Sequence, residues 1–485
     1  MDSSYRSVQT QPAHSYNAAY VWGISSVGAL GGLLFGYDWV VIGGAKPFYE
    51  KYFQLMSESS VGWANSCALI GCLLGSIVSG SVSDRFGRKK LLILSALLFV
   101  VSSLLTAWAQ SFSSFVTWRI AGGVAIGIAS NVSPTYIAEV SPAPWRGRLV
   151  TLNQLTIVVG ILAAQIVNWL IADAVPESAT AEMIRQSWNG QYGWRWMFTA
   201  VAVPSLIFFF AAMFIPESPR WLAKAGANQR ARGTLARIGG EEYSEEAMAE
   251  IQASLSTQWQ SVAPRRELRT PYVLKLLLIG VCLAVLQQWS GINIIFNYAE
   301  EIYRNAGYGV SSILFNIVVT GAINLVFTLV ALGLVDKFGR RALMLFGCAG
   351  IALSHAVLGL AYRSGIKGLP VLVLTLCTIA CYALSLAPVT WVLISEIFPN
   401  RVRGFAVSVS VSALWIASFL LTFTFPILHR TFGPAYTFWI YAVVCLAGFF
   451  FVFRRVPETK GRTLEQIECE FAGTAQRPRS SATST

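Results

Sequence analysis

Runs of about 20 mostly apolar residues recur twelve times along this chain of 485 residues, and they constrain its fold more than any other feature. A helix rises about 1.5 Å per residue, so each run is long enough to cross a hydrocarbon core of about 30 Å. A helix also satisfies its backbone hydrogen bonds internally, as a segment surrounded by lipid must. The sequence therefore predicts an all-α membrane protein with twelve transmembrane helices, at 20–43, 61–82, 91–110, 114–138, 149–172, 196–215, 273–299, 311–335, 342–362, 370–395, 405–428 and 436–453.

The charge distribution predicts the orientation of these helices. Only 12% of the residues are charged, against about 25% in soluble domains, which argues against a soluble enzyme. The net charge is +12, but the sequence has no basic patch interleaved with aromatic residues, so it does not indicate nucleic-acid binding. With the N-terminus placed inside, the inner segments hold 27 of the 36 lysines and arginines. By the positive-inside rule, we expect a multi-pass protein of the cell membrane with both termini cytoplasmic.

The cysteines and the three histidines are scattered through the sequence. They lack the spacing of a metal site, a disulfide framework or a catalytic triad. We therefore expect no metal, no cofactor and no catalytic residue, and the chain is not predicted to be an enzyme.

Three motifs occur twice, in the same order. GSVSDRFGRKK at 80–90 reappears as LGLVDKFGRRA at 332–342, AEVSPAPWRGRL at 138–149 as SEIFPNRVRGFA at 395–406, and PESPRWL from 216 as PETKGRTL from 457. Repeats at equivalent spans indicate two homologous six-helix halves in parallel orientation. We expect a cytoplasmic tail at 1–19, six-helix bundles at 20–215 and 271–455, a helical cytoplasmic linker at 216–270 and a second cytoplasmic tail at 456–485.

The repeated motifs place acids and bases at the cytoplasmic ends of both halves. The positive-inside rule alone explains the basic residues, but not an aspartate and a glycine at fixed places in both copies. We hypothesise that ion-pair networks here stabilise the state that is closed on the inside and break when it opens. The predicted network residues are Asp84, Arg85, Arg88, Glu139, Arg146, Glu217, Arg220, Asp336, Arg340, Glu396, Arg403 and Glu458.

The motif set resembles the sugar porter family of the major facilitator superfamily. The resemblance rests on the twelve spans, the DRFGRK and DKFGRR loops, PESPR, PETKG and QQWSGIN, and extends from about residue 20 to 470. The chain is similar to the family's bacterial proton-linked D-xylose symporters and to its facilitative glucose transporters. The resemblance implies two pseudo-symmetric six-helix bundles, short cytoplasmic helices and monosaccharide transport by alternating access.

Several amides and aromatic residues lie within the predicted spans. Sugar hydroxyls both donate and accept hydrogen bonds, so a sugar site needs neutral amides and aromatic faces more than charges. Taken alone, such an amide is as readily a helix–helix contact, worth about 0.6 to 2 kcal/mol, and such a tryptophan more often an interfacial or packing residue. The resemblance implies that eight of these residues bind the sugar: Phe35, Gln154, Gln287, Gln288, Asn293, Asn324, Trp391 and Trp415. We expect a helix break at Gly291 to bring the amides around it together.

Some positions depart from the family pattern. Asn297 replaces the first of two tyrosines after the QQWSGIN motif, so an external gating tyrosine is lost. Ala387, Leu414 and Ser418 replace residues that the family uses in the tenth-span hinge and around the sugar. These positions affect selectivity, and the identity of the sugar is left open.

Asp38 and Arg119 are ionisable residues within predicted spans. Burying either one unpaired costs at least about 2.5 to 3.5 kcal/mol, so we expect a mutual pair. Desolvation favours the protonated aspartate and a neighbouring arginine the ionised one, so opening and closing the site would switch proton binding. Asp38 matches the proton-carrying aspartate of the xylose symporters, whereas Val201 stands where they have a further membrane acid. A purely structural ion pair is the alternative.

We therefore expect a proton-coupled symporter of a hexose or pentose. Its partners would be a monosaccharide, protons and the lipid bilayer, without nucleic acid, and we expect a monomer. A facilitative uniporter is the nearest alternative. A membrane sugar sensor is a further one, although only about 30 residues follow the last span.

Overall fold

The computed structural model describes residues 15–176, 179–260, 270–398 and 402–458, and the regular elements of these ranges are all helices. The first half contains α1 (Ala18–Tyr52), α2 (Glu58–Phe86), α3 (Arg88–Ala107), α4 (Phe112–Val140), α5 (Ala143–Ile171) and a sixth span made of η1 (Asn189–Gly193), α7 (Trp194–Ala200) and α8 (Ala202–Phe214). The second half contains α11 (Pro271–Trp289) with α12 (Ile292–Asn297), α14 (Val310–Phe338), α15 (Arg340–Arg363), α16 (Leu369–Leu384) with α17 (Leu386–Glu396), and α18 (Arg403–Arg455). Shorter connections are α6 (Ala181–Gln186) and α13 (Ala299–Asn305), and α9 (Pro219–Lys224) and α10 (Asn228–Gln260) lie between the halves in the sequence.

The described part of the chain confirms the predicted number of spans. Eleven helical stretches are long and apolar enough to cross a membrane. The last of them, Gly404–Arg455, contains the two final predicted spans. Gly433 separates these two spans because its left-handed backbone (φ 80°) interrupts α18.

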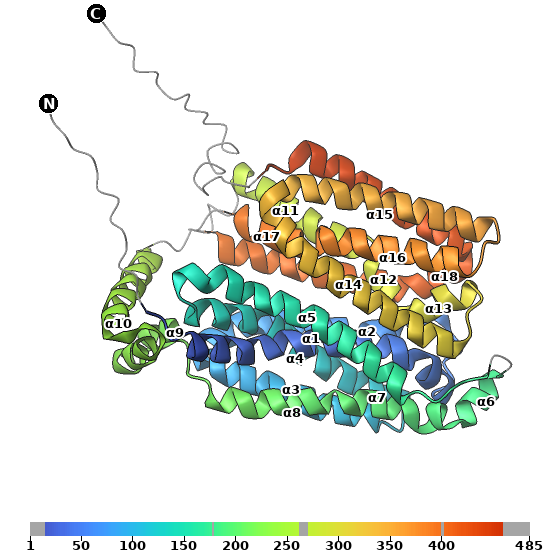
Figure 1. Ribbon diagram of the computed structural model, residues 1–485, viewed down its shortest axis with the longest axis horizontal. Helices are drawn as coiled ribbons and strands as arrows, with labels where there is room; N and C mark the ends of the chain where they lie inside the picture. The colour runs from blue at the N-terminus through green and yellow to red at the C-terminus, as the bar shows by residue number, and fades with distance from the viewer. Residues whose placement is uncertain (1–14, 177–178, 261–269, 399–401, 459–485) are drawn as a thin grey trace, which may run out of the picture.

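The twelve spans form two bundles that lie side by side (Figure 1). Helices α1 to α8 make one bundle and α11 to α18 the other. Across their contact, α2 packs against α18 and α5 packs against α14. The helices α9 and α10 lie at one end of the bundles, which we call the linker face, and α6 and α13 lie at the other end, the opposite face (Figure 1).

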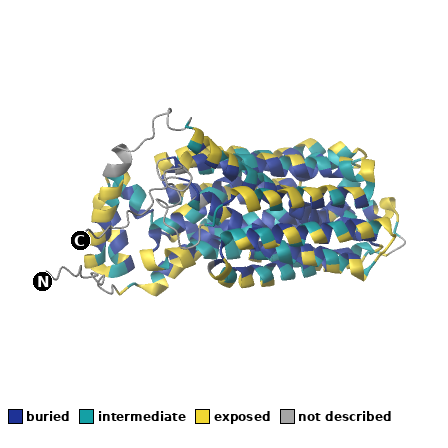
Figure 2. Ribbon diagram, turned by 90° about the horizontal axis from the view of Figure 1, so that it is seen from above, coloured by how far each residue is buried: buried dark blue, intermediate teal, exposed yellow. Residues whose placement is uncertain are grey.

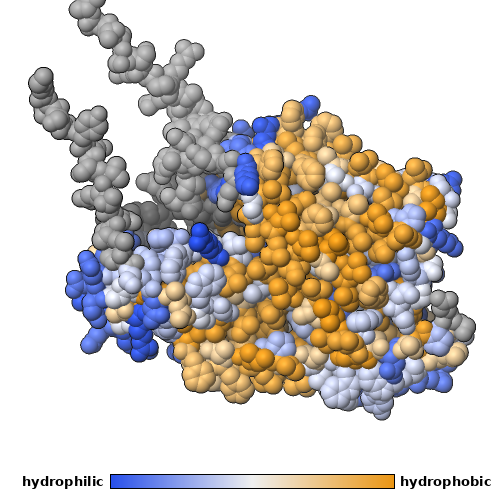
Figure 3. All heavy atoms as spheres, viewed as in Figure 1, coloured by the Kyte–Doolittle hydropathy of each residue, from blue (hydrophilic) through white to orange (hydrophobic). Residues whose placement is uncertain are grey.

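An apolar belt covers the side of the bundles that Figure 3 shows. The face seen in Figure 3 is mostly hydrophobic between two hydrophilic ends. Large apolar side chains such as Leu353 and Val443 are exposed on the surface of the protein. The buried residues lie between the helices (Figure 2). A monomeric soluble protein rarely exposes so large an apolar patch, so the belt is the surface that contacts lipid.

Glycines let the helices of the first bundle approach each other closely. A Cβ atom on Gly123 of α4 would lie 1.9 Å from the carbonyl oxygen of Ala68 in α2, and one on Gly71 of α2 would lie 2.0 Å from that of Ile120. Small residues are the usual means of helix association in lipid, where burial of apolar surface gives little drive. The glycines therefore hold α2 and α4 together as one rigid unit.

Two boundaries differ from the predicted ones. Helix α1 continues through the expected outer loop as far as Tyr52, which places Lys46 and Glu50 inside a helix and one turn apart. The segment between the predicted spans 149–172 and 196–215 contains α6 and the π-helical η1, which extends the sixth span. The first difference arises because Lys46 is neutralised by carboxylates from both bundles, so its charge does not end the buried helix.

Candidate substrate and proton sites

A cavity of about 1010 Å³ lies between the two bundles. Its lining extends to the linker-face ends of the helices, at Pro144 and Arg148 of α5 and at Arg340 and Glu396 of the second bundle. The cavity is therefore accessible from the linker face. The structure brings all eight predicted substrate residues into its lining: Phe35, Gln154, Gln287, Gln288, Asn293, Asn324, Trp391 and Trp415.

A helix break at Gly291 positions the amides of the second bundle. Gly291 has a left-handed backbone (φ 87°) and separates α11 from α12. The break lets Asn293 hydrogen-bond to Gln288, which in turn donates to Gln287 Oε1 at 3.2 Å. The carbonyl that the break frees, on Ser290, lies 2.9 Å from His355 Nε2. The expected convergence of these amides at Gly291 is thus present in the structure.

Other cavity amides are open to a ligand. Gln154 of α5 and Asn324 of α14 line the cavity from the two bundles, and neither side chain is hydrogen-bonded to a described residue. Asn293 uses its Nδ2 for Gln288 and for Ser418 Oγ, the latter at 3.2 Å. The site can therefore offer several neutral donors and acceptors to a polyhydroxylated ligand.

The cavity lining includes residues that the sequence did not predict. Trp39, Tyr382 and Phe296 also face the cavity. Trp39 follows the predicted proton residue directly, and its position one helical turn after Phe35 was the signal that could have found it. A second break, at Ser385 (φ −134°, ψ −84°), divides α16 from α17 and lets Gln287 donate to the Leu386 carbonyl at 3.3 Å.

Asp38 and Arg119 form a buried ion pair between α1 and α4. Arg119 Nη1 lies 3.0 Å from both carboxylate oxygens of Asp38, and the two residues are 2% and 3% exposed. Neither residue lines the cavity, which Phe35, Gly36 and Trp39 line from the same helix. One face of α1 thus contacts the substrate cavity while another carries the ion pair.

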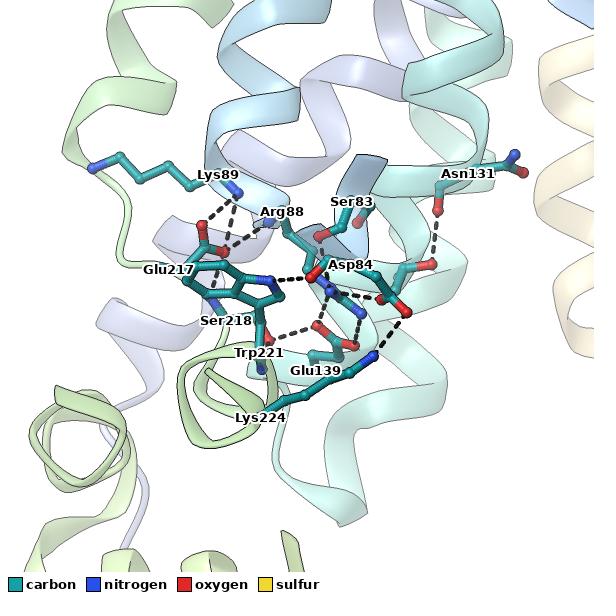
Figure 4. A network of polar contacts seen from close by, with 11 residues as sticks. Ser83, Asp84, Arg88, Lys89, Asn131, Glu139, Glu217, Ser218, Trp221 and Lys224 are labelled. Carbon is teal, nitrogen blue, oxygen red and sulfur yellow. Dashed lines mark hydrogen bonds and ion pairs between the residues drawn. The ribbon is translucent and has the colours of Figure 1, made fainter. Parts of the chain in front are cut away.

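Polar contacts at the linker face hold the first bundle together (Figure 4). Arg88 pairs with Glu139 at 2.9 Å and with Asp84 at 3.2 Å. Lys224 of α9 reaches Asp84 at 2.8 Å. Glu217 accepts hydrogen bonds from the backbone N–H groups of Arg88 and of the next residue, at the N-terminus of α3. A carboxylate at this position neutralises the positive end of the helix dipole.

The second bundle repeats this arrangement. Arg340 pairs with Glu396 at 3.4 Å. Glu458 accepts from the backbone N–H groups of Arg340 and Arg341 at the N-terminus of α15. The residue before each of these helices is a glycine with a left-handed backbone: Gly87 (φ 98°) before α3 and Gly339 (φ 85°) before α15. A larger residue would not fit at either position, because its Cβ atom would collide with the Glu217 or Glu458 carboxylate.

These ion pairs differ from the expectation in one respect. They are formed although the cavity reaches the linker face, and their members belong to the same bundle or, for Lys224, to the adjoining α9. The hypothesis that such pairs break when this face opens stays a prediction.

The remaining network residues have other environments. Arg85 is exposed and lies over the Phe86 ring, with 5.3 Å from its Cζ to the centroid. Arg146 donates to the Ala138 carbonyl rather than to Glu139, and Arg220 donates to Ser254 Oγ. The side chains of Asp336 and Arg403 lie outside the described part of the structure.

A buried ion cluster joins the bundles at the opposite face. Lys46 of α1 is 1% exposed, and its Nζ lies 3.0 Å from Glu50 and 3.2 Å from Glu300. It also pairs with Glu301, and Arg304 pairs with Glu300. Because Glu300, Glu301 and Arg304 belong to α13, these contacts tie α1 to the second bundle. Lys46 lies between the predicted spans 20–43 and 61–82, so the sequence did not single it out.

Close backbone contacts complete the closure of the opposite face. A Cβ atom on Gly43 of α1 would lie 2.5 Å from the Phe296 carbonyl oxygen, and one on Gly62 of α2 would lie 2.4 Å from that of Phe423. An exposed ion pair, Arg430 with Glu58 at 3.0 Å, lies across the same boundary. The bundles are thus in tight contact at the opposite face while the cavity reaches the linker face.

Two bundles around a cavity that is lined by amides and aromatic side chains and that, in the described part of the chain, reaches the linker face define a membrane transporter of the alternating-access class. The model of the Sugar (and other) transporter family matches residues 24–471, so the chain belongs to this family.

Individual relatives agree with this assignment. The chain is 37% identical over 499 residues to the D-xylose-proton symporter of Escherichia coli (strain K12), with 96% of this chain and 99% of that protein covered. It is 39% identical over 455 residues to the arabinose-proton symporter of Bacillus subtilis (strain 168), covering 94% and 96%. Among solved structures, the inward-open conformation of the xylose transporter from E. coli matches with a TM-score of 0.81, at 36% identity, covering 93% of this chain and all of that one.

Proposed function

We propose that this protein is a proton-coupled importer of a monosaccharide that works by alternating access between its two bundles. One observation carries the proposal. Helix α1 lines a cavity that contains neutral amides, and the same helix carries Asp38, which forms a buried ion pair with Arg119 of α4. The amides suit a neutral, hydroxyl-rich substrate, and an ionisable pair inside a membrane marks an ion or proton pathway. Both named relatives are sugar–proton symporters, which supports the same reading.

We further propose that the linker face is cytoplasmic and that the structure is inward-open. The predicted inner segments hold most of the lysines and arginines, as the positive-inside rule requires. The similarity to an inward-open xylose transporter supports the same orientation. We infer that the halves begin and end near the predicted boundaries 20–215 and 271–455. A single chain supplies both the cavity and its closure, so a monomer suffices.

Uptake into proteoliposomes tests the function. Purified full-length protein is supplied with labelled D-xylose, L-arabinose, D-glucose and D-galactose, with and without an acidic outside medium. We expect at least one sugar to accumulate above its outside concentration only when the pH gradient is present, with acidification of the lumen. If the sugar only equilibrates across the membrane, without accumulation or proton movement, the result would support the facilitative uniporter. If the sugar binds without any uptake, the result would support the sensor.

Removing an amide from the cavity should weaken sugar binding. Asn293→Ala deletes one hydrogen-bonding group and removes the donor to Gln288 Oε1. We expect the dissociation constant of the best substrate to rise about 10- to 100-fold. Isothermal titration calorimetry measures this directly. Asn65→Ala is the matched control because Asn65 is a buried amide of α2 that hydrogen-bonds to the Val61 carbonyl and does not line the cavity. An equal loss in both variants contradicts a substrate role for Asn293.

A further inference from the structure

Three aromatic rings form a corner in the wall of the cavity. Trp39 and Phe35 come from α1, and Trp415 comes from α18 in the other bundle. The ring centroids are 6.1 Å apart for Phe35 and Trp39, 6.0 Å for Phe35 and Trp415, and 5.9 Å for Trp39 and Trp415. All three distances lie within the range of about 4.5 to 7 Å in which aromatic rings contact each other. The corner is therefore a continuous aromatic surface built from both bundles.

Trp39 lies on the closed side of this corner. Helix α1 runs from the linker face to the opposite face, so Trp39 is one turn nearer to the opposite face than Phe35. Beyond it along α1 come the close contact of Gly43 with Phe296 and the Lys46 cluster. A ligand entering from the linker face therefore meets Trp39 at the far end of its path.

The corner also carries hydrogen-bond donors without partners. Trp415 is 2% exposed, and its buried Nε1 has no hydrogen-bond partner among the described residues. The indole N–H of Trp39 likewise forms no hydrogen bond with a described residue. Leaving the buried Trp415 donor unpaired is unfavourable, and the half-buried Trp39 lines the cavity, so both N–H groups suit a ligand that brings acceptors to the edges of the rings.

We propose that Trp39 is a substrate-contacting specificity residue, and that the corner of Phe35, Trp39 and Trp415 selects pyranoses whose ring hydroxyls are all equatorial. This inference rests on the proposed sugar transport and names the class of sugar. In an all-equatorial pyranose the faces carry only C–H groups and the hydroxyls lie around the rim. Such a ring presents an apolar face to the aromatic corner and its rim to the amides and indole N–H groups.

An axial hydroxyl disrupts this fit. It projects from the face of the sugar toward an aromatic ring, where it loses its water without gaining an equivalent hydrogen bond. Burial of a hydroxyl without compensation corresponds to about a 5- to 150-fold loss of affinity. Two sugar pairs isolate this effect, because D-xylose differs from L-arabinose, and D-glucose from D-galactose, by the orientation of one ring hydroxyl in the favoured chair.

Calorimetric binding of these four sugars to the purified full chain tests the proposal. We expect the wild type to bind the equatorial member of each pair at least about fivefold more tightly. Trp39→Ala should bring both ratios to within about twofold because one wall of the corner is removed. Trp39→Leu, which fills more of the space without an aromatic face, should lower the ratios in the same direction and covers the case in which the alanine variant is poorly folded.

Trp63→Ala is the matched control. Trp63 packs edge to face on Phe419 and does not line the cavity. We expect it to leave both ratios unchanged, with folding of every variant checked by thermal unfolding. A wild type without preference in either pair, or unchanged ratios in Trp39→Ala and Trp39→Leu, overturns the role of Trp39. Failure of all four sugars to bind the wild type would instead overturn the sugar function itself.

Discussion

If the buried pair carries the proton, replacing Asp38 with asparagine is expected to abolish uphill sugar accumulation and to leave sugar binding in place. Asparagine has the same shape but cannot ionise, so the carrier can no longer bind and release a proton in each cycle. Because neither Asp38 nor Arg119 lines the cavity, the sugar contacts remain. With one proton per sugar, a gradient of one pH unit drives up to about tenfold accumulation, and we expect this ratio to fall to one.

Counterflow separates a lost proton step from a damaged protein. Proteoliposomes loaded with unlabelled sugar should still exchange it for labelled sugar through Asp38→Asn, because exchange needs no net proton movement. Glu182→Gln is the control, since Glu182 forms an exposed ion pair with Arg185 on α6 and should retain full accumulation. Full accumulation by Asp38→Asn would remove proton symport through this residue, and loss of counterflow as well would favour the purely structural ion pair.

Replacing Lys46 with methionine should open the opposite face. The change leaves Glu50, Glu300 and Glu301 together without the cation that they share. Breaking a buried ion pair in this way costs about 3 kcal/mol or more, which shifts the equilibrium away from the closed face by roughly 150-fold. Spin labels at the exposed positions Ser59 and Thr431, with accessible cysteines replaced by serine, would report the larger separation of the bundles.

The pH dependence of this variant has a defined sign. Burial raises the pKa of the Glu301 carboxyl, and the Lys46 ammonium opposes that rise. Without Lys46, the carboxylates must bind protons to be buried. The closed face of Lys46→Met is therefore stabilised at low pH and is lost as the pH rises through the raised pKa of Glu301.

Two comparisons make the Lys46 result specific. Arg430→Gln removes the exposed pair with Glu58 across the same boundary and should change the closure by no more than about 1 kcal/mol. Adding Glu50→Gln and Glu301→Gln to Lys46→Met removes two of the three carboxylate charges, while Glu300 keeps its pair with Arg304, and should restore the closed distance. An unchanged distance in Lys46→Met at neutral pH would show that the backbone contacts at Gly43 and Gly62 close this face unaided.

The sequence predicted the architecture well because lipid imposes simple rules on a chain. Each span needs a long apolar run, and the duplicated motifs revealed the two halves. Its errors lie where helices join or where charges are paired in space. Helix α1 continues past Lys46, which the sequence did not reveal because the partners Glu300 and Glu301 lie far away in the sequence.

The cavity was predictable in its residues but not in its geometry. Gln154 and Asn293 stand out as amides within apolar runs, and the structure brings both into one cavity. Trp39 was overlooked because an aromatic residue in a span is usually a packing or interfacial residue. The pairing of Arg88 within its own bundle could not be read from spacing, because sequence distance does not say which bundle a partner belongs to.

The size of the cavity makes water a participant in the transport cycle. A volume of about 1010 Å³ corresponds to about 30 water molecules at their volume in the liquid. A monosaccharide displaces only part of that water, so closing the linker face has to expel the rest. Osmolytes that cannot enter the cavity therefore favour the closed state, and the position of the conformational equilibrium depends on the osmotic strength of the medium as well as on sugar and proton gradients.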